Sequence, residues 1–202
     1  MNFVGPKVGG TWFWNTYPGV GCDVVSHLYS FSFFRNARWT KSYSLGDEIL
    51  KYISFFSYYN GLDKHVELKT KVLSTEWDKN KQKWIVHLDN IGENIKKIEE
   101  YSWIISGIGG LHIPTRPKFP GKFSGIELHS AEWDSRVDFK GKKVALIGTG
   151  ASSIQLLPKL INEMECQTVT MFQRTAPFIF PRLGSPILII DFVIQTQKSY
   201  DL

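Results

Sequence analysis

The turn Gly148-Thr149-Gly150 combines residue types that can surround a phosphate group with backbone amides. An apolar run at residues 143–147 precedes it, and residues with helical periodicity follow it. A dinucleotide cradle needs this order, because the amides and the dipole at the start of the helix hold the diphosphate. Ser153 stands where the usual pattern has a third glycine, and its small side chain still permits close packing of helix on strand. The pattern predicts a nucleotide site, and an ordinary strand-to-helix turn is the alternative.

An arginine follows the next predicted strand, which ends in Arg174-Thr175. A unit that prefers NAD usually has an acidic residue at this position for the ribose hydroxyls. Arginine can instead bind a 2′-phosphate through two parallel charge-assisted hydrogen bonds. A solvated surface arginine is the alternative, but beside the Gly148 turn this residue favours NADP over NAD.

The elements that position these residues form a β-α-β unit over residues 143–174. Its first strand is a continuous apolar run, which is typical of a parallel strand buried on both faces. Pro158 is expected to kink the helix, because proline removes an N–H from the hydrogen-bond ladder. The helix is expected to bury one apolar face, formed by Ile154, Leu157, Ile161 and Met164.

The N-terminal half of the chain predicts a different set of elements. Residues 1–45 are rich in aromatic residues and glycine without clear periodicity, which indicates irregular backbone. Apolar residues recur at spacings of three and four over residues 47–59, which predicts an amphipathic helix. Alternating apolar residues at 66–72 and 84–88 flank a charged connection and predict a β-hairpin. Residues 102–105 predict a short buried strand.

Composition excludes several classes of protein. The 202 residues are 43% hydrophobic and 21% charged, an ordinary globular mixture rather than a collagen, a coiled coil or a disordered chain. The net charge of +5 is scattered, so no nucleic-acid or membrane-surface patch is predicted, and no apolar run reaches the ~20 residues that span a bilayer. The N-terminus lacks the features of a signal peptide. Two distant cysteines, Cys22 and Cys166, argue against a disulfide framework and favour a soluble, cytoplasmic protein. No metal site is predicted.

Two longer patterns resemble the fingerprints of Baeyer-Villiger flavin monooxygenases. The first is F-x-G-x-x-x-H-x-x-x-W followed by Pro or Asp, and it is matched by Phe123, Gly125, His129, Trp133 and Asp134. The second is G-x-W-x-x-x-x-Y-P-G-x-x-x-D, and it is matched by Gly10, Trp12, Tyr17, Pro18, Gly19 and Asp23. Both occur in the order of the family, and the resemblance extends from about Val8 to Arg182.

The resemblance implies an FAD domain interrupted by an inserted NADP domain. The α/β chain would then comprise a partial FAD-binding domain (1–113), an inter-lobe linker with the fingerprint (114–132) and a partial Rossmann-like NADP-binding domain (133–202). A divergent tail would begin at about residue 183.

The resemblance also implies the site residues. The positions that it assigns to FAD are Gly10, Thr11, Trp12, Asp23, Tyr29 and Val72. The positions that it assigns to NADP are Gly148, Thr149, Gly150, Ala151, Ser152, Arg174 and Thr175. Asp23 and His129 are the implied catalytic residues, and His129 would link the lobes and position the NADP lobe. A core aromatic at Trp12, a turn cap at Asp23 and a structural histidine at His129 are the alternatives.

The chemistry that the resemblance implies belongs to the cofactors. NADPH reduces FAD, the reduced flavin takes O2 to a C4a-peroxide, and one oxygen atom is inserted into a ketone or soft heteroatom of a small-molecule substrate. The related flavin-containing N- or S-oxygenating group is one alternative. Another is a non-catalytic nucleotide-binding or interaction fragment, because the family's FAD diphosphate cradle has no match before Gly10. On this basis the chain is expected to be an internal fragment.

Overall fold

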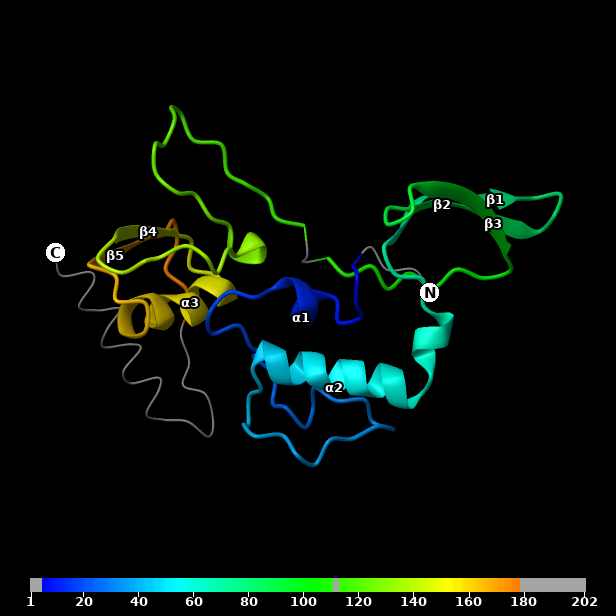
Figure 1. Cartoon of the computed structure of the whole chain (residues 1–202), viewed down its shortest axis with the longest axis horizontal. Coiled ribbons are helices and arrows are strands. Elements are labelled where there is room, and N and C mark those ends of the chain that lie inside the picture. Colours follow the sequence, from blue (N-terminus) through cyan, green and yellow to red (C-terminus); the bar gives the residue numbers. More distant parts are fainter. Residues whose placement is uncertain (1–4, 111–112, 179–202) are drawn as a thin grey trace. The chain divides into compact units, whose positions relative to one another are not determined.

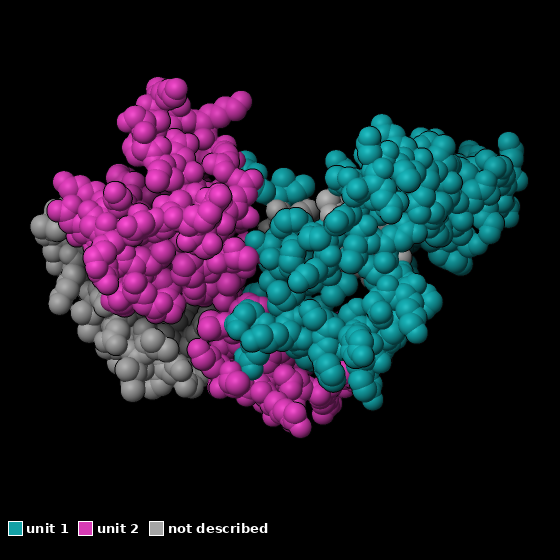
Figure 2. Space-filling view, in the orientation of Figure 1, with its two compact units in different colours: residues 1–14, 47–115 teal, residues 15–46, 116–202 magenta. Residues whose placement is uncertain are grey.

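The computed structural model describes residues 5–110 and 113–178. The chain divides into two compact units, the first built from residues 1–14 and 47–115 and the second from residues 15–46 and 116–202 (Figure 2). The chain contains both helices and strands, and β4, α3 and β5 follow one another as a β-α-β unit, so the predicted α/β class is confirmed. The elements are α1 (Thr11–Trp14), α2 (Gly46–Tyr59), the 3-10 turn η1 (Leu62–His65), β1 (Thr70–Asp78), β2 (Lys83–Asn90), β3 (Ile95–Tyr101), the 3-10 turn η2 (Ser130–Glu132), β4 (Lys143–Ile147), α3 (Ala151–Asn162) and β5 (Thr168–Phe172) (Figure 1).

The divergent tail predicted from about residue 183 lies outside the described residues. Among the residues that the structure does describe, no helix combines the length and the apolar character needed to cross a membrane.

The amphipathic helix predicted at residues 47–59 is confirmed as α2. Two acidic residues lie in its first turn, where carboxylates interact favourably with the positive end of the helix dipole. Ile49 and Tyr52 are buried, three residues apart on one face. The helix ends before Gly61, which takes the left-handed backbone conformation with φ of 64°.

Strands β1, β2 and β3 form an antiparallel sheet in that order, so the predicted hairpin is confirmed and gains a third strand. The first strand begins at Thr70 rather than near residue 66, and its register shifts at a bulge after Val72. Trp77 lies opposite Trp84, with ring centroids 5.5 Å apart. Strand β3 escapes prediction because its apolar residues are three apart, a spacing typical of a helix.

Residues 102–105 do not form the predicted buried strand. Trp103 is 86% exposed and Ile105 is 95% exposed. A short apolar strand is stable when neighbouring strands pair with it and other side chains cover it. Within the described residues no strand pairs with this segment, so the apolar pattern alone does not make it a strand.

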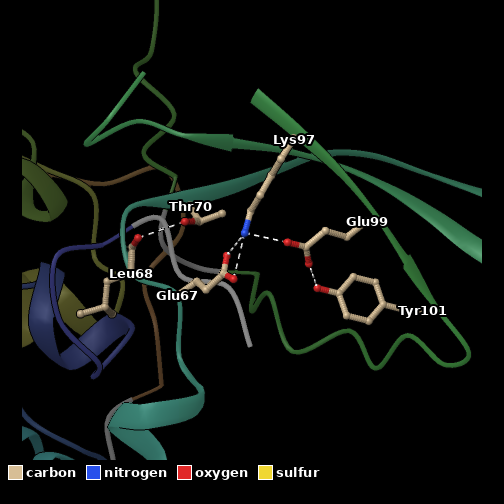
Figure 3. Close-up of polar contacts among 6 residues, drawn as sticks. All are labelled: Glu67, Leu68, Thr70, Lys97, Glu99 and Tyr101. Carbon is tan, nitrogen blue, oxygen red and sulfur yellow. Dashed lines mark hydrogen bonds and ion pairs between the residues drawn. The ribbon is translucent and has the colours of Figure 1, made fainter. Parts of the chain in front are cut away.

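One face of the three-stranded sheet holds a lysine between two carboxylates (Figure 3). The Nζ of Lys97 lies 2.8 Å from a carboxylate oxygen of Glu67 and 2.7 Å from one of Glu99. Tyr101 donates its hydroxyl to Glu99. The hydrogen bonds to both carboxylates raise the pKa of Lys97, and the bond from Lys97 lowers the pKa of Glu99. The bond to Glu99 raises the pKa of Tyr101 to about 12.

Replacing Lys97 with methionine is expected to flatten the acid side of the stability profile. The pKa of Glu99 is lowered in the folded state. Its contribution is therefore present above the unfolded carboxyl pKa of about 4.3 and is lost as the pH falls through the lowered value. Urea unfolding between about pH 7 and pH 3, followed by tryptophan fluorescence, measures this loss. The exposed Lys64 provides the matched control, Lys64→Met. The same pH dependence in Lys97→Met and in the wild type would contradict the assignment.

In the second unit, β4 and β5 pair in parallel and α3 connects them, so the predicted β-α-β unit is confirmed. Leu156 and Leu160 of α3 are buried in a cluster with Tyr17, which comes from the N-terminal segment of this unit. The helix continues for a turn beyond Pro158. The core of this unit therefore joins the β-α-β unit to a segment more than a hundred residues earlier in the chain.

The expected burial of β4 on both faces is wrong. Val144 and Leu146 face the core cluster, whereas Ile147 is 58% exposed. Among the described residues, helix α3 packs on one face of a sheet of two strands, and the side chains of the other face are exposed.

The predicted buried face of α3 is only partly right. Leu157 is buried as expected, but the other fully buried positions are Leu156 and Leu160 rather than Ile154 and Ile161. The shift has a physical cause, because α3 packs against Tyr17 as well as against the sheet.

Candidate functional site

The Gly148 turn lies at the carboxyl end of the parallel strands. The amide of Gly148 donates to the carbonyl of Phe172 across 2.8 Å, which extends the pairing of β4 and β5 by one residue. Gly148 has φ of 102°, a conformation that favours glycine. A Cβ at this position would meet only the Oγ of Ser153, at 3.9 Å, so Ser153 fits where the usual pattern has glycine. The glycine requirement here comes from the backbone angle and not from crowding.

The N-terminus of α3 is open to an anion. Gly150 is the N-cap residue, and no side chain in the described part of the chain caps the helix. The first intrahelical bond runs from Ile154 N–H to the carbonyl of Gly150, which leaves the amides of residues 151–153 without an intrahelical acceptor. A Cβ on Gly150 would meet no atom of the described residues within 4 Å. These amides and the helix dipole can together hold a phosphate group.

Arg174 and Thr175 follow β5 on the same side of the sheet as this helix N-terminus. Because the strands are parallel, their carboxyl ends lie at one edge, and Arg174 comes two residues after the end of β5. Both side chains are exposed. Across residues 5–110 and 113–178, no ion pair involves Arg174, so its guanidinium is available to an anionic ligand.

The second half of the Gly10-to-Asp23 pattern packs on α3 just after the nucleotide turn. Tyr17 donates its hydroxyl to the Oε1 of Gln155 across 2.8 Å. The side-chain amide of Gln155 donates to the carbonyl of Gly21 at 2.9 Å and accepts from the amide of Gly21 at 3.3 Å. Burial raises the pKa of Tyr17, and a hydrogen bond to Ser152 opposes that shift. Two of the predicted motifs are therefore joined within one unit.

A glycine allows this close packing. A Cβ on Gly19 would lie 2.6 Å from the main-chain oxygen of Gln155 and 3.1 Å from the Cγ of Lys159. Its φ of 83° also favours glycine. The backbone of this segment thus lies directly against the backbone of α3.

His129 caps the 3-10 turn η2. Its Nδ1 accepts a hydrogen bond from the amide of Ala131 across 3.1 Å, and its main-chain carbonyl accepts from the amide of Glu132. An accepting Nδ1 places the proton of the neutral ring on Nε2. The side chain therefore has a structural contact on one nitrogen and a donor on the other.

Replacing His129 with asparagine is expected to preserve the cap, because the asparagine oxygen can accept from Ala131 N–H in place of Nδ1. Alanine removes the acceptor and is expected to destabilise the fold by about 1 kcal/mol. Urea unfolding of the two variants beside the wild type measures the difference. Equal destabilisation by asparagine and alanine would show that the Nδ1 cap is not what stabilises this turn.

The end of the fingerprint is held by local contacts. Trp133 stacks on Phe139 with ring centroids 5.3 Å apart. Asp134 binds Arg136 through two parallel hydrogen bonds of 2.8 Å, and the pKa of Asp134 is lowered to about 2 by this pairing. Arg116 forms an ion pair with Glu132.

The residues assigned to FAD are divided between the two units. Trp12 lies half-buried in α1 with Thr11, directly after Gly10, which has φ of 54°. Val72 is 45% exposed on β1, opposite Leu88. These four positions belong to the first unit.

The other two FAD positions belong to the second unit, with the nucleotide turn. Asp23 is exposed and follows the buried Cys22. Tyr29 is 37% exposed, and its amide donates to the carbonyl of Val25. The structure thus brings the Asp23 segment together with α3.

The sequence patterns do not identify Gln155 as a contact of this site. The signal available was its place on the helix, three residues after Ser152 and four before Lys159, on the face that meets Tyr17, Gly19 and Gly21. That spacing indicates a shared helix face, but it does not identify the segment that the face contacts.

Comparisons with known proteins agree with these motifs. A family model described as flavin-binding monooxygenase-like matches residues 16–200. A Baeyer-Villiger monooxygenase of Streptomyces coelicolor is 37% identical over 183 residues, which are 90% of this chain and 34% of that protein. The chain spans about a third of the length of the curated relatives that it matches.

Solved structures of monooxygenases are also similar to this chain. An oxidized steroid monooxygenase bound to NADP is 32% identical with a TM-score of 0.78, over 89% of this chain and 34% of that one. The enzyme OTEMO in complex with FAD and NADP is 27% identical with a TM-score of 0.79, over 97% of this chain and 39% of that one.

Proposed function

The chain belongs to the flavin-binding monooxygenase-like family, as its resemblance to Baeyer-Villiger monooxygenases predicts, and we propose that it supplies the NADP-binding turn of such an oxygenase. The observation that supports this most directly is the N-terminus of α3, which follows the positive-φ Gly148 and which no described side chain caps. Amides of residues 149–152 would hold the diphosphate of NADP. Arg174 and Thr175, at the same edge of the parallel sheet, would hold the 2′-phosphate.

The FAD part of the proposal rests on the other family pattern. Trp12 and Tyr29 would contact the flavin, with Gly10, Thr11 and the backbone of Val72 as further contacts. Asp23 would face the flavin as a catalytic residue. His129 would position the NADP lobe through its Nε2 donor. Bound FAD, once reduced by NADPH, would supply the chemistry that inserts one oxygen atom of O2 into a ketone or soft heteroatom.

These assignments also divide the chain into three parts with different proposed roles. Residues 1–113 would contribute to FAD binding, residues 114–132 would connect the lobes, and residues 133–202 would contribute to NADP binding. The two compact units divide the chain differently, because residues 15–46 pack with the β-α-β unit.

Calorimetric titration of the purified chain tests the proposed nucleotide site. One equivalent of NADP⁺ is expected to bind, and NAD⁺ is expected to bind more weakly, because only NADP⁺ offers a 2′-phosphate to Arg174. No binding of NADP⁺ would refute the site.

The oxygenation step has its own test. NADPH consumption and product formation are measured with added FAD, once with a cyclic ketone and once with a thioether. Oxidation of the ketone supports the Baeyer-Villiger reaction, and oxidation of the thioether alone favours the heteroatom-oxygenating alternative. A colourless protein with no FAD-dependent oxidation would refute catalysis by this chain and favour a nucleotide-binding role.

A further inference from the structure

The side chain of Gln155 hydrogen-bonds α3 to the segment that leads to Asp23. Its amide nitrogen donates to the carbonyl of Gly21 at 2.9 Å. Its Oε1 accepts from the amide of Gly21 at 3.3 Å and from the hydroxyl of Tyr17 at 2.8 Å. The side chain thus pairs with both main-chain groups of Gly21, as a neighbouring strand would pair with it.

These contacts continue in both directions along the chain. Toward the nucleotide turn, Ser152 in the first turn of α3 lowers the pKa of Tyr17 and so opposes the effect of burial. In the other direction, Gly21 is followed by Cys22, which is 4% exposed and whose amide donates to the carbonyl of Ser44. Asp23 comes next and is exposed.

The hydrogen bonds of Gln155 indicate that this residue orients the segment from Tyr17 to Gly21, and does not only fill space beside it. An apolar side chain at position 155 would fill the same half-buried space without needing hydrogen-bond partners. A buried amide costs free energy unless its donor and acceptor are paired, and both groups of Gln155 are paired to one short segment. Such a network fixes one geometry of that segment, because other geometries leave polar groups unpaired.

We propose that Gln155 is a positioning residue that couples occupation of the Gly148–Ser152 turn to the placement of Asp23. The inference rests on the proposed nucleotide site. A nucleotide that binds the first turn of α3 stabilises Ser152 and the helix end, and Gln155 and Tyr17 pass that stabilisation to the segment from Tyr17 to Asp23.

The test uses Cys22 as a reporter beside Asp23, with Cys166 as an internal control in the same unit. The full chain is alkylated with iodoacetamide, and the rate at each cysteine is followed by peptide mass spectrometry with and without NADP⁺. The variants are Gln155→Met, which keeps the length of the side chain, and Tyr17→Phe, which keeps the ring. Gln167→Met, at an exposed glutamine of the same unit, is the matched control.

In Gln155→Met without nucleotide, alkylation of Cys22 is expected to accelerate about tenfold relative to Cys166, because the hydrogen bonds to Gly21 and Tyr17 are lost. Tyr17→Phe is expected to give a smaller acceleration, and Gln167→Met none. In the wild type, saturating NADP⁺ is expected to slow the alkylation of Cys22. In Gln155→Met this slowing is expected to disappear even though calorimetry still detects NADP⁺ binding.

Each other outcome counts against a defined part of the argument. An unchanged Cys22 rate in Gln155→Met would overturn the positioning role, and so would protection by NADP⁺ that survives the substitution. If both cysteines accelerate equally in Gln155→Met, the unit unfolds more readily and Tyr17→Phe decides: an unchanged ratio of Cys22 to Cys166 rates there overturns the proposal. If the wild type does not bind NADP⁺, the proposed function fails, whereas the rates without nucleotide still test the contact of Gln155 with Gly21.

Discussion

Arg174→Ala is expected to weaken NADP⁺ binding about a hundredfold while it changes NAD⁺ binding little. The two nucleotides differ only in the 2′-phosphate, so the ratio of their dissociation constants isolates the contact with that group. Arg174 lies two residues beyond β5, at the edge where the Gly148 turn begins, and no carboxylate of the described residues forms an ion pair with it. The substitution therefore leaves no partner unpaired within the described part of the chain.

Calorimetric titration of both nucleotides into both proteins gives the measurement. Arg38→Ala, at an exposed arginine of the same unit, controls for the loss of one positive charge from a chain of net charge +5. Lysine at position 174 is expected to recover only part of the affinity, because an ammonium group lacks the planar fork that makes two parallel bonds. Equal losses for NADP⁺ and NAD⁺ would show that Arg174 does not contact the 2′-phosphate.

The elements that could be predicted from the sequence are those whose signal is local. Helix α2 follows from its apolar spacing of three and four, and the β1–β2 hairpin follows from alternation on both sides of a polar turn. The Gly148 turn could be predicted for the same reason, because its strand, its glycines and its helix are consecutive.

The elements that escaped prediction depend on pairing between distant residues. Strand β3 has apolar residues at positions 95, 98 and 101, as a helix would, and it is a strand because β2 pairs with it. The segment 102–105 is the opposite case. Its apolar run is typical of a strand, but it is not a strand, because no described strand pairs with it. Periodicity reports which face of an element is apolar, and it does not report which neighbour is available.

The candidate site shows the same limit. Gln155 and Gly21 are 134 residues apart, and the local sequence around each of them does not predict their contact. The family pattern includes Tyr17 and Gly19, but a list of matched positions does not show that Tyr17 is buried against α3 or that Gly19 touches its backbone. These contacts depend on tertiary packing, which the local sequence patterns do not describe.

Gly19→Ala is expected to destabilise the second unit by about 3 kcal/mol or more, because strain and overlap act together. The new Cβ would lie 2.6 Å from the main-chain oxygen of Gln155, and the φ of 83° is unfavourable for alanine. A flexible side chain could move aside, but a carbonyl within the hydrogen-bond ladder of α3 cannot. Urea unfolding measures the cost, and the alkylation rate of Cys166 locates it in this unit.

Gly141→Ala separates the two causes. Gly141 has φ of 67° in the same unit, and a Cβ there would meet no atom within 4 Å, so only the backbone strain of about 1 kcal/mol is expected. Adding Gln155→Ala to Gly19→Ala is expected not to restore stability, since the obstructing atom belongs to the main chain and remains after the side chain is shortened. Equal costs for Gly19→Ala and Gly141→Ala would show that the backbone of Gly19 does not lie against α3. In that case the backbone of the Gly19 segment would not approach α3 closely where Gln155 contacts Gly21.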